Sequence, residues 1–448
     1  MESVMNKTKL AMVCALLTTM AGCNSGSSSD GPGELGSPNI KGDPSLDKIY
    51  SYQESDLSTT AIECAKIYKQ NLSCSLEKIR PIGANRTEDI TLEEIQSRLL
   101  VSHQWMAESF IAALKAINDQ DLLNLFKPLN TIVLSYDIRP SFYHSRTASM
   151  YIDARYLWRD YSDWRTIHQQ DDYRKEFARE FTYENASRYV YGQTLNYVTV
   201  SNQYDSKRNS TRSAEKIAPG LFRLLAHELA HANDLLPPND LLQLASRGTI
   251  LNEIEDANHI YSQLSSAHGL TSQLLLEAAA TSFHGKPMTD LVRNSTGEQA
   301  GGEFETDGAA AFYGYSTERE DVATLFESYM MHKKYGAIDE VAFVSVPQTE
   351  AYTCDDWKIL WGQRDRLSDK NVRSRALFVA QQILDQTPQV IEENLPPVSS
   401  VPTAMPIGKG WCETLGANYD SAAGARFAAP YSKAGERFGY LEDIGAKE

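Results

Sequence analysis

Apolar residues recur at helical spacing over most of the chain, which indicates that helices form the larger part of the fold. Residues from about 46 to 129 are predicted to be a helical region, and its clearest stretch runs from Thr91 to Asn118. Thr91 followed by Glu94 has the pattern of a capping box at a helix start. Residues from about 216 to 392 are also predicted to be mostly helical, apart from a glycine-rich loop from Gly297 to Gly308.

Three short runs rich in β-forming residues interrupt the helical pattern. They cover residues 131–138, 148–154 and 195–200. Such runs predict a small antiparallel or mixed sheet packed against helices. The expected fold class is therefore α+β, and the chain shows no internal repeats.

The first 22 residues have the pattern of an export signal. Lys7 and Lys9 precede an apolar run, Leu10 to Ala21, that is too short to span a bilayer. The run ends in Met20-Ala21-Gly22-Cys23, which resembles the lipobox of bacterial lipoproteins. That resemblance implies cleavage before Cys23 and lipid attachment to its sulfur. An ordinary secretory peptide with an incidental cysteine is the alternative.

Residues 23–45 are rich in Ser, Gly and Pro, as expected of a flexible tether between a lipid and a folded domain. Asn24 follows the cysteine, and the absence of aspartate there favours the outer membrane of a bacterial envelope. The expected location is thus that of an exported, lipid-anchored protein.

Composition limits the classes of partner. The chain has 448 residues, of which 42% are hydrophobic, so it is long and apolar enough to bury a sizeable core. Its net charge of −16 opposes binding to phosphate backbones, which makes nucleic acid a poor partner.

Four cysteines remain beyond the signal region and the lipobox: Cys64, Cys74, Cys354 and Cys412. An even number in an exported chain predicts two disulfides. Three pairings are possible, and the cheaper closure of short loops favours Cys64–Cys74 with Cys354–Cys412. A Cys₄ zinc site is disfavoured, because no two of these residues form a CxxC pair.

The sequence from His227 to His231 contains the pattern HExxH. Two histidines four positions apart project from one face of a helix, so that both rings can bind one Zn²⁺. Glu228 then lies where it can reach a metal-bound water. Pro219 suits the first turn of this helix, and the Pro237-Pro238 pair is expected to end it. The alternative is a surface helix with two solvated histidines, which the apolar neighbours disfavour.

A third protein ligand is required, and a downstream carboxylate is expected to supply it. The metzincin extension is excluded, since Asp234 and Pro237 stand where that class has glycine and histidine. The stretch from Ser316 to Met331 resembles the second zinc helix of gluzincin metallopeptidases, in which an E-D-x-A pattern supplies the glutamate. That resemblance implies Glu320 as the ligand. The adjacent acid, Asp321, is expected to orient a ligand histidine by accepting a hydrogen bond from its other ring nitrogen.

Glu253 and Glu255 are rival ligands. The pattern Asn252-Glu253-x-x-Asp256 resembles the thermolysin-like arrangement, although the flanking sequence departs from it. Asp234, one turn after His231, is a further candidate for a residue that supports the site.

These patterns predict a zinc metallopeptidase acting on proteins or peptides, with Glu228 as general base. Tyr313 and Tyr315 are the candidate donors to the oxyanion, by similarity to gluzincins. An extended substrate is expected to pair with the strand at 148–154 or at 195–200. Two other functions remain open: a non-catalytic zincin-like lipoprotein that binds a partner, and an amidase acting on cell-wall peptides.

The expected architecture is a zincin-like catalytic domain at 130–345, preceded by the helical region 46–129. Residues 346–448 are expected to form a C-terminal subdomain that contains a disulfide. The active site would lie in a cleft between the sheet with its HExxH helix and a mostly helical second lobe.

Overall fold

The computed structural model describes residues 44–70, 72–169, 177, 180–206, 209–348 and 352–416. All of them belong to one unit of the chain, Leu35–Glu448. The signal region 1–22, the lipobox cysteine Cys23 and nearly all of the tether lie outside the described residues. None of the helices in the described part is long and apolar enough to cross a membrane.

The fold is α+β, and its first sheet has five strands. Their order is β1 (Tyr50–Ser51), β2 (Leu99–Val101), β3 (Thr131–Ser135), β5 (Ser149–Asp153) and β4 (Phe142–His144). The three inner strands are parallel to one another, and both edge strands, β1 and β4, are antiparallel to their neighbours. The sheet is therefore mixed.

Both faces of this sheet are buried, because successive side chains of a strand point to opposite faces. Ile132 and Leu134 of β3 belong to the core shared with α3 (Gln104–Ile117) and α6 (Ala214–Leu235). Val133 between them faces the core under α1 (Ser58–Lys66) and α8 (Ile250–Asp256). The continuous apolar run of β3 reflects this burial on both sides.

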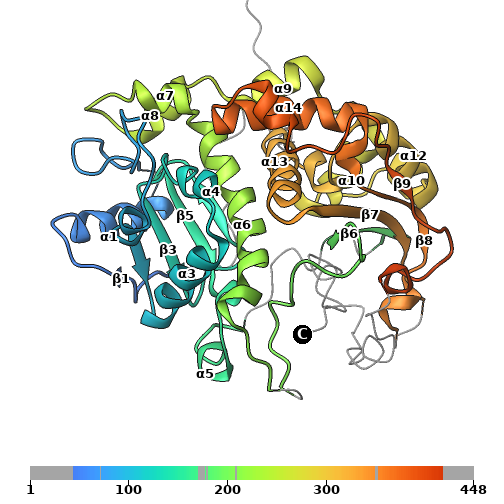
Figure 1. The fold of residues 1–448 in the computed structure, drawn as a ribbon, viewed down its shortest axis with the longest axis horizontal. Helices are drawn as coiled ribbons and strands as arrows, with labels where there is room; N and C mark the ends of the chain where they lie inside the picture. The colour runs from blue at the N-terminus through green and yellow to red at the C-terminus, as the bar shows by residue number, and fades with distance from the viewer. Residues whose placement is uncertain are drawn as a thin grey trace, which may run out of the picture. The chain divides into compact units, whose positions relative to one another are not determined.

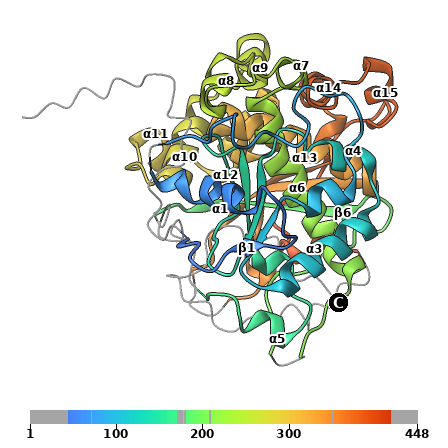
Figure 2. The same ribbon diagram turned by 90° about the vertical axis from the view of Figure 1, so that its left-hand side faces the viewer.

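The second sheet is antiparallel, in the order β6 (Tyr183–Tyr191), β7 (Ala337–Ser345), β8 (Ile359–Arg364) and β9 (Thr403–Ala404). Helix α13 (Glu318–Tyr335) packs against both α6 and β7. In Figure 1, α6 stands between the first sheet on the left and α13 with the second sheet on the right. The view in Figure 2, turned by 90°, looks onto the side of α1 and α3.

The remaining helices are α2 (Leu92–Gln96), α4 (Gln120–Asn124), α5 (Tyr161–Trp164), α7 (Pro238–Leu242), α9 (Ile260–His268), α10 (Gln273–His284), α11 (Asp290–Arg293), α12 (Gly297–Asp307), α14 (Lys370–Leu384) and α15 (Pro388–Glu392).

Two of the three predicted strands are present, as β3 and β5. The run at 195–200 forms no strand and contributes only a single bridge, from Tyr197 to Val190. The strand in this part of the chain is β6, which sequence reasoning missed. Its pattern is masked because Arg188 points inward and forms a buried ion pair with Glu340 of β7.

The helical predictions need two corrections. The capping box at Thr91 is present, but α2 ends at Gln96 and strand β2 separates it from α3. The stretch from Gly297 is helix α12 and not a loop. Its glycines allow close packing on β8, since a Cβ at Gly301 would lie 2.1 Å from Cγ of Trp361.

Helix α6 begins five residues before Pro219, so this proline lies inside the helix and not at its first turn. The end of the helix agrees with the prediction, because α6 stops at Leu235, two residues before the Pro237-Pro238 pair.

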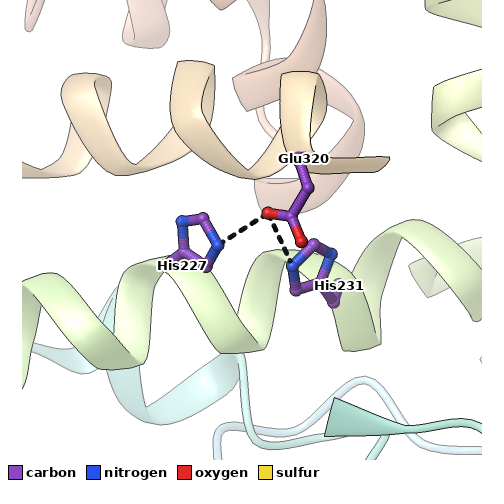
Figure 3. A group of neighbouring side chains, drawn as sticks. All are labelled: His227, His231 and Glu320. Carbon is purple, nitrogen blue, oxygen red and sulfur yellow. Dashed lines mark hydrogen bonds and ion pairs between the residues drawn. The ribbon is translucent and has the colours of Figure 1, made fainter. Parts of the chain in front are cut away.

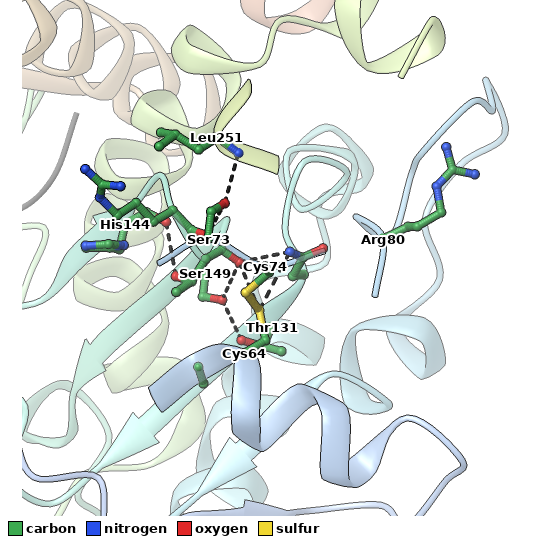
Figure 4. Close-up of a disulfide and its surroundings, with 12 residues drawn as sticks. Cys64, Ser73, Cys74, Arg80, Thr131, His144, Ser149 and Leu251 are labelled. Atoms are coloured by element: carbon green, nitrogen blue, oxygen red, sulfur yellow. Dashed lines mark hydrogen bonds between the residues drawn. A yellow bond between two sulfur atoms is a disulfide. The ribbon is translucent and has the colours of Figure 1, made fainter. Parts of the chain in front are cut away.

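Both predicted disulfides are present, Cys64–Cys74 and Cys354–Cys412. The first joins α1 to the segment that precedes α2, as Figure 4 shows. The second brackets β8 and β9, together with the exposed side chains of Val398 and Val401. Because β8 pairs with β7, the region expected as a C-terminal subdomain completes the second sheet. Disulfides of this kind indicate an exported, non-cytoplasmic protein.

Candidate metal centre

Two antiparallel helices bring three potential metal ligands together. His227 and His231 project from α6, and Glu320 projects from the first turn of α13 toward both rings (Figure 3). Oε2 of Glu320 lies 3.0 Å from Nε2 of His227 and 3.4 Å from Nε2 of His231. In the described part of the chain, this is the one group of His, Cys, Asp and Glu side chains found to have the spacing of a metal site, with ligand atoms within 4.8 Å of one another.

The spacing fits zinc. Ligand atoms about 2.0–2.1 Å from a tetrahedral Zn²⁺ lie about 3.3 Å from each other. The two nitrogen–oxygen distances at Glu320 are close to that value. The imidazole rings of His227 and His231 are 5.1 Å apart and nearly perpendicular, so neither ring blocks the other. Two imidazoles and one carboxylate are also a donor set that zinc accepts, with a fourth position left for water.

The local sequence explains why the ligands are held firmly. Leu221, Leu225 and Leu229 are fully buried on α6 and anchor it in the core. On α13, the side chain of Thr317 accepts a hydrogen bond from the backbone amide of Glu320 and caps the helix one turn ahead of the ligand. Each ligand therefore sits on a rigid, packed helix.

A carboxylate behind His227 orients its ring. Nδ1 of His227 lies 3.0 Å from Oε2 of Glu327, and Arg223 donates a hydrogen bond of 2.8 Å to the other oxygen of Glu327. Burial opposes ionisation of Glu327, but the charges of Arg223 and His227 lower its pKa to about 2. An ionised Glu327 can only accept at Nδ1, which leaves Nε2 of His227 to face Glu320.

The electrostatics of the three ligands favour a bound cation. Burial alone lowers the pKa of His227, yet hydrogen bonds to Glu320 and Glu327 raise it well above its usual value. Burial raises the pKa of Glu320, but the charges of His231 and His227 outweigh it and hold the pKa well below its usual value. The site thus concentrates negative charge around two imidazoles, where a divalent ion can replace the protons.

Glu327 was not among the residues singled out from the sequence, which assigned the orienting role to Asp321. The carboxylate of Asp321 instead receives the guanidinium of Arg375, and neither histidine ring contacts it. Burial raises the pKa of Asp321 to about 6 against the charge of Arg375. The available signal for Glu327 was its spacing, since a residue seven positions after Glu320 lies on the same helix face two turns later.

The rival ligands lie elsewhere. Glu253 on α8 accepts a hydrogen bond of 2.9 Å from the backbone amide of Ala245, and Glu255 is exposed. Asp234 is fully buried beyond His231, and its carboxylate accepts a hydrogen bond of 2.7 Å from the amide of Tyr261 at the start of α9. Burial raises the pKa of Asp234 to about 7.

Glu228 is buried beside the ligands. Burial raises its pKa, while the charges of His227 and His231 and a backbone hydrogen bond from Tyr143 act in the opposite direction. Tyr143 belongs to β4, and this edge strand packs against α6. A carboxylate with a raised pKa in this position can accept and return a proton.

The two candidate tyrosines differ. The ring of Tyr313 stacks on the ring of His227, with centroids 6.1 Å apart and planes inclined by 21°. The hydroxyl of Tyr315 donates to Asp307 at 3.0 Å, and the residue is 3% exposed. Tyr315 is therefore committed to the core and not free to serve a reaction at the metal centre, which leaves Tyr313.

The substrate strand also needs correction. Strand β5 is paired on both sides, by β3 and β4, and the run at 195–200 forms no strand. The sheet edge beside α6 is β4.

No protein-family model matches the chain, and comparisons with curated proteins and with solved structures find no similar protein. The geometry of the site is therefore what bears on its function.

Proposed function

We propose that the protein is a zinc-dependent peptidase of the gluzincin type. The observation that carries this proposal is the convergence of His227, His231 and Glu320 within the range of a single ion, beside the buried carboxylate of Glu228. The arrangement of a mixed sheet, an antiparallel edge strand and an HExxH helix supports a zincin-like domain for residues around the site.

Each residue has a distinct part in the proposed reaction. Zinc, when bound, supplies a water of lowered pKa and polarises the scissile carbonyl. Glu228 takes a proton from the attacking water and passes it to the leaving nitrogen. The hydroxyl of Tyr313 is the proposed donor to the oxygen that becomes negative during the attack.

Strand β4 is the proposed docking edge for the substrate. An extended peptide adds to a free sheet edge through main-chain hydrogen bonds. The backbone of β4 at Tyr143 already contacts Glu228, so a peptide paired with this strand would run beside the general base.

The proposed cellular setting is the bacterial envelope. The two disulfides support export, and the lipobox pattern supports a lipid anchor at Cys23 on the outer membrane. Peptides or proteins in the envelope or outside the cell are then the substrate class.

The test begins with the full chain, purified in detergent. We expect about one zinc per chain by elemental analysis, together with hydrolysis of casein that a chelator abolishes and added zinc restores. Glu228→Gln is expected to keep the metal and to lower hydrolysis by about 10²–10⁴-fold, since that is the range of general-base catalysis.

Two results would contradict the proposal: wild-type protein that binds no zinc, or a Glu228→Gln variant with undiminished hydrolysis. A parallel assay with peptidoglycan fragments distinguishes a cell-wall amidase from a general peptidase. Zinc binding without hydrolysis of either material would favour a partner-binding lipoprotein.

A further inference from the structure

Arg319 directly precedes the candidate ligand Glu320, and its charge lowers the pKa of the buried Asp234. It lies on the first turn of α13 and is half-buried. Its guanidinium lies 5.1 Å from the centre of the Tyr261 ring. Within the residues that the structure describes, it forms no ion pair and donates no hydrogen bond to a protein group.

Local structure does not account for this side chain. A positive charge in the first turn of a helix opposes the helix dipole, so Arg319 does not stabilise α13 in that way. Other arginines around the α6–α13 pair are saturated: Arg223 binds Glu327, and Arg375 binds Asp321. No nitrogen of Arg319 is among the buried atoms that lack a partner, so solvent reaches its guanidinium and a ligand can reach it as well.

The position of Arg319 is set by α9. The ring beneath it belongs to Tyr261, whose amide donates to Asp234, one turn beyond His231 on α6. Arg319 therefore lies at the His231 end of the metal centre, whereas Arg223 and Glu327 lie at the His227 end. The Cα atoms of Arg319 and Glu320 are about 3.8 Å apart, because the two residues are consecutive. An extended peptide advances about 3.3 Å per residue, so we expect Arg319 to meet a substrate group a few residues from the cleaved bond.

We propose that Arg319 binds a carboxylate of the peptide substrate close to the scissile bond. This inference rests on the peptidase function proposed above and names its substrate class. A planar guanidinium recognises carboxylates with two parallel hydrogen bonds, and the Tyr261 ring holds it in a fixed orientation. Because the chain carries a net charge of −16, an unpaired cation at the site gives acidic peptides a specific point of attachment. The carboxylate is either the C-terminus of the peptide or an Asp or Glu side chain.

Affinity selection tests the proposal without requiring turnover. Zinc-loaded Glu228→Gln protein is immobilised and exposed to a random peptide library prepared with free C-terminal carboxylates and again with C-terminal amides. Mass spectrometry identifies what is retained. We expect enrichment of peptides with a carboxylate, at least about tenfold over neutral ones, since hydrogen bonds between charged groups contribute that much. Preference for the free acid over the amide assigns the C-terminus, and equal retention with enriched Asp or Glu assigns a side chain.

The same selection is repeated with Arg319→Met added, which removes the charge and keeps the bulk, and with Arg319→Lys, which keeps the charge. The methionine variant should lose the enrichment and the lysine variant should keep part of it. Arg247→Met, at an exposed arginine away from the site, is the matched control and should change nothing. Zinc content and melting temperature verify that each variant is folded.

Retention that does not depend on carboxylates, or a preference that survives Arg319→Met, would overturn the proposal. Failure of the peptidase function has a different signature, because casein then stays intact with wild-type protein whatever the outcome of the selection.

Discussion

The two histidines of the candidate metal centre lie on one helix, one turn apart, but their surroundings differ. His227 has a carboxylate at each ring nitrogen, and one of these, Glu327, is itself fixed by Arg223. In the described residues, Glu320 is the one carboxylate that contacts His231. Beyond His231 come the buried Asp234 and the unpaired Arg319.

The difference teaches which end of the site is built to be rigid. The His227 end is closed by charge pairs among protein groups, so we expect it to fix the geometry of a bound metal. The His231 end carries Arg319, which forms no direct ion pair among the described residues, so we expect it to meet the proposed substrate. Five substitutions along the α6–α13 pair test this division, from the largest expected effect to the smallest.

Replacing Glu320, the carboxylate that contacts both histidines, should have the largest effect. Glu320→Gln is expected to weaken zinc binding by more than about a hundredfold, which exceeds the effect of losing an orienting partner. Competition with a chromogenic chelator measures the affinity. A variant that binds zinc as tightly as the wild type would show that Glu320 is not a ligand.

Removing the residues that orient His227 should have the next largest effect on zinc binding. Glu327→Gln is expected to weaken zinc binding by about 10–100-fold, because Nδ1 of His227 loses its ionised acceptor. Arg223→Gln should act in the same direction and more weakly, since it removes the charge that keeps Glu327 ionised. Equal zinc affinity in all three proteins would contradict the orienting role of Glu327.

The buried Asp234 predicts a pH dependence at the other end. Its pKa is about 7 in the folded protein and 3.8 in its usual state, so the folded state holds the proton more tightly than the unfolded state. This group therefore lowers the free energy of unfolding as the pH rises from about 4 to about 7, by about 1.4 kcal/mol per pKa unit. Asp234→Asn should remove that slope.

Urea unfolding at a series of pH values, with a chelator present, checks the slope. The stability of Asp234→Asn relative to the wild type should rise between pH 4 and pH 7 and stay constant above. A difference between the two proteins that does not vary with pH would show that Asp234 titrates normally.

The smallest effect on zinc binding is expected at the His231 end of the site. Arg319→Met should change zinc affinity by less than about twofold, since its guanidinium contacts neither the ligands nor Glu327. The same chelator competition measures it. A large loss of zinc affinity would show that Arg319 supports the metal and does not bind the substrate. The two ends of the site would then not differ in function.

The sequence reveals the candidate ligands and Glu228 more readily than the residues that surround them. His227, Glu228 and His231 follow from helical spacing alone, and Glu320 from a short resemblance in α13. Glu327 was not predicted because its partner, His227, is remote in sequence and because the residues around Glu327 form no known motif. Tyr315 was misjudged for a related reason, as its acceptor, Asp307, is identified by the folded structure and not by proximity to Glu320.

The same limit applies to the fold. Strands β3 and β5 each carry a run of three hydrophobic residues that is visible in the sequence, whereas β6 contains a buried arginine whose partner lies on β7. Helix α12 resembled a loop because glycines were taken as breakers. Gly297 and Gly301 instead allow close contact with Leu360 and Trp361, about sixty positions further along the chain. Pairings between distant segments are what local patterns do not contain.

The disulfide between Cys354 and Cys412 has a consequence for resistance to proteolysis. The exposed valines at 398 and 401 lie between the two cysteines, on a stretch that is accessible to proteases. A single cut there would leave both fragments covalently joined, with β9 still tied to the body of the molecule. An exported protein that meets proteases would therefore keep its two fragments together after a cut in this loop.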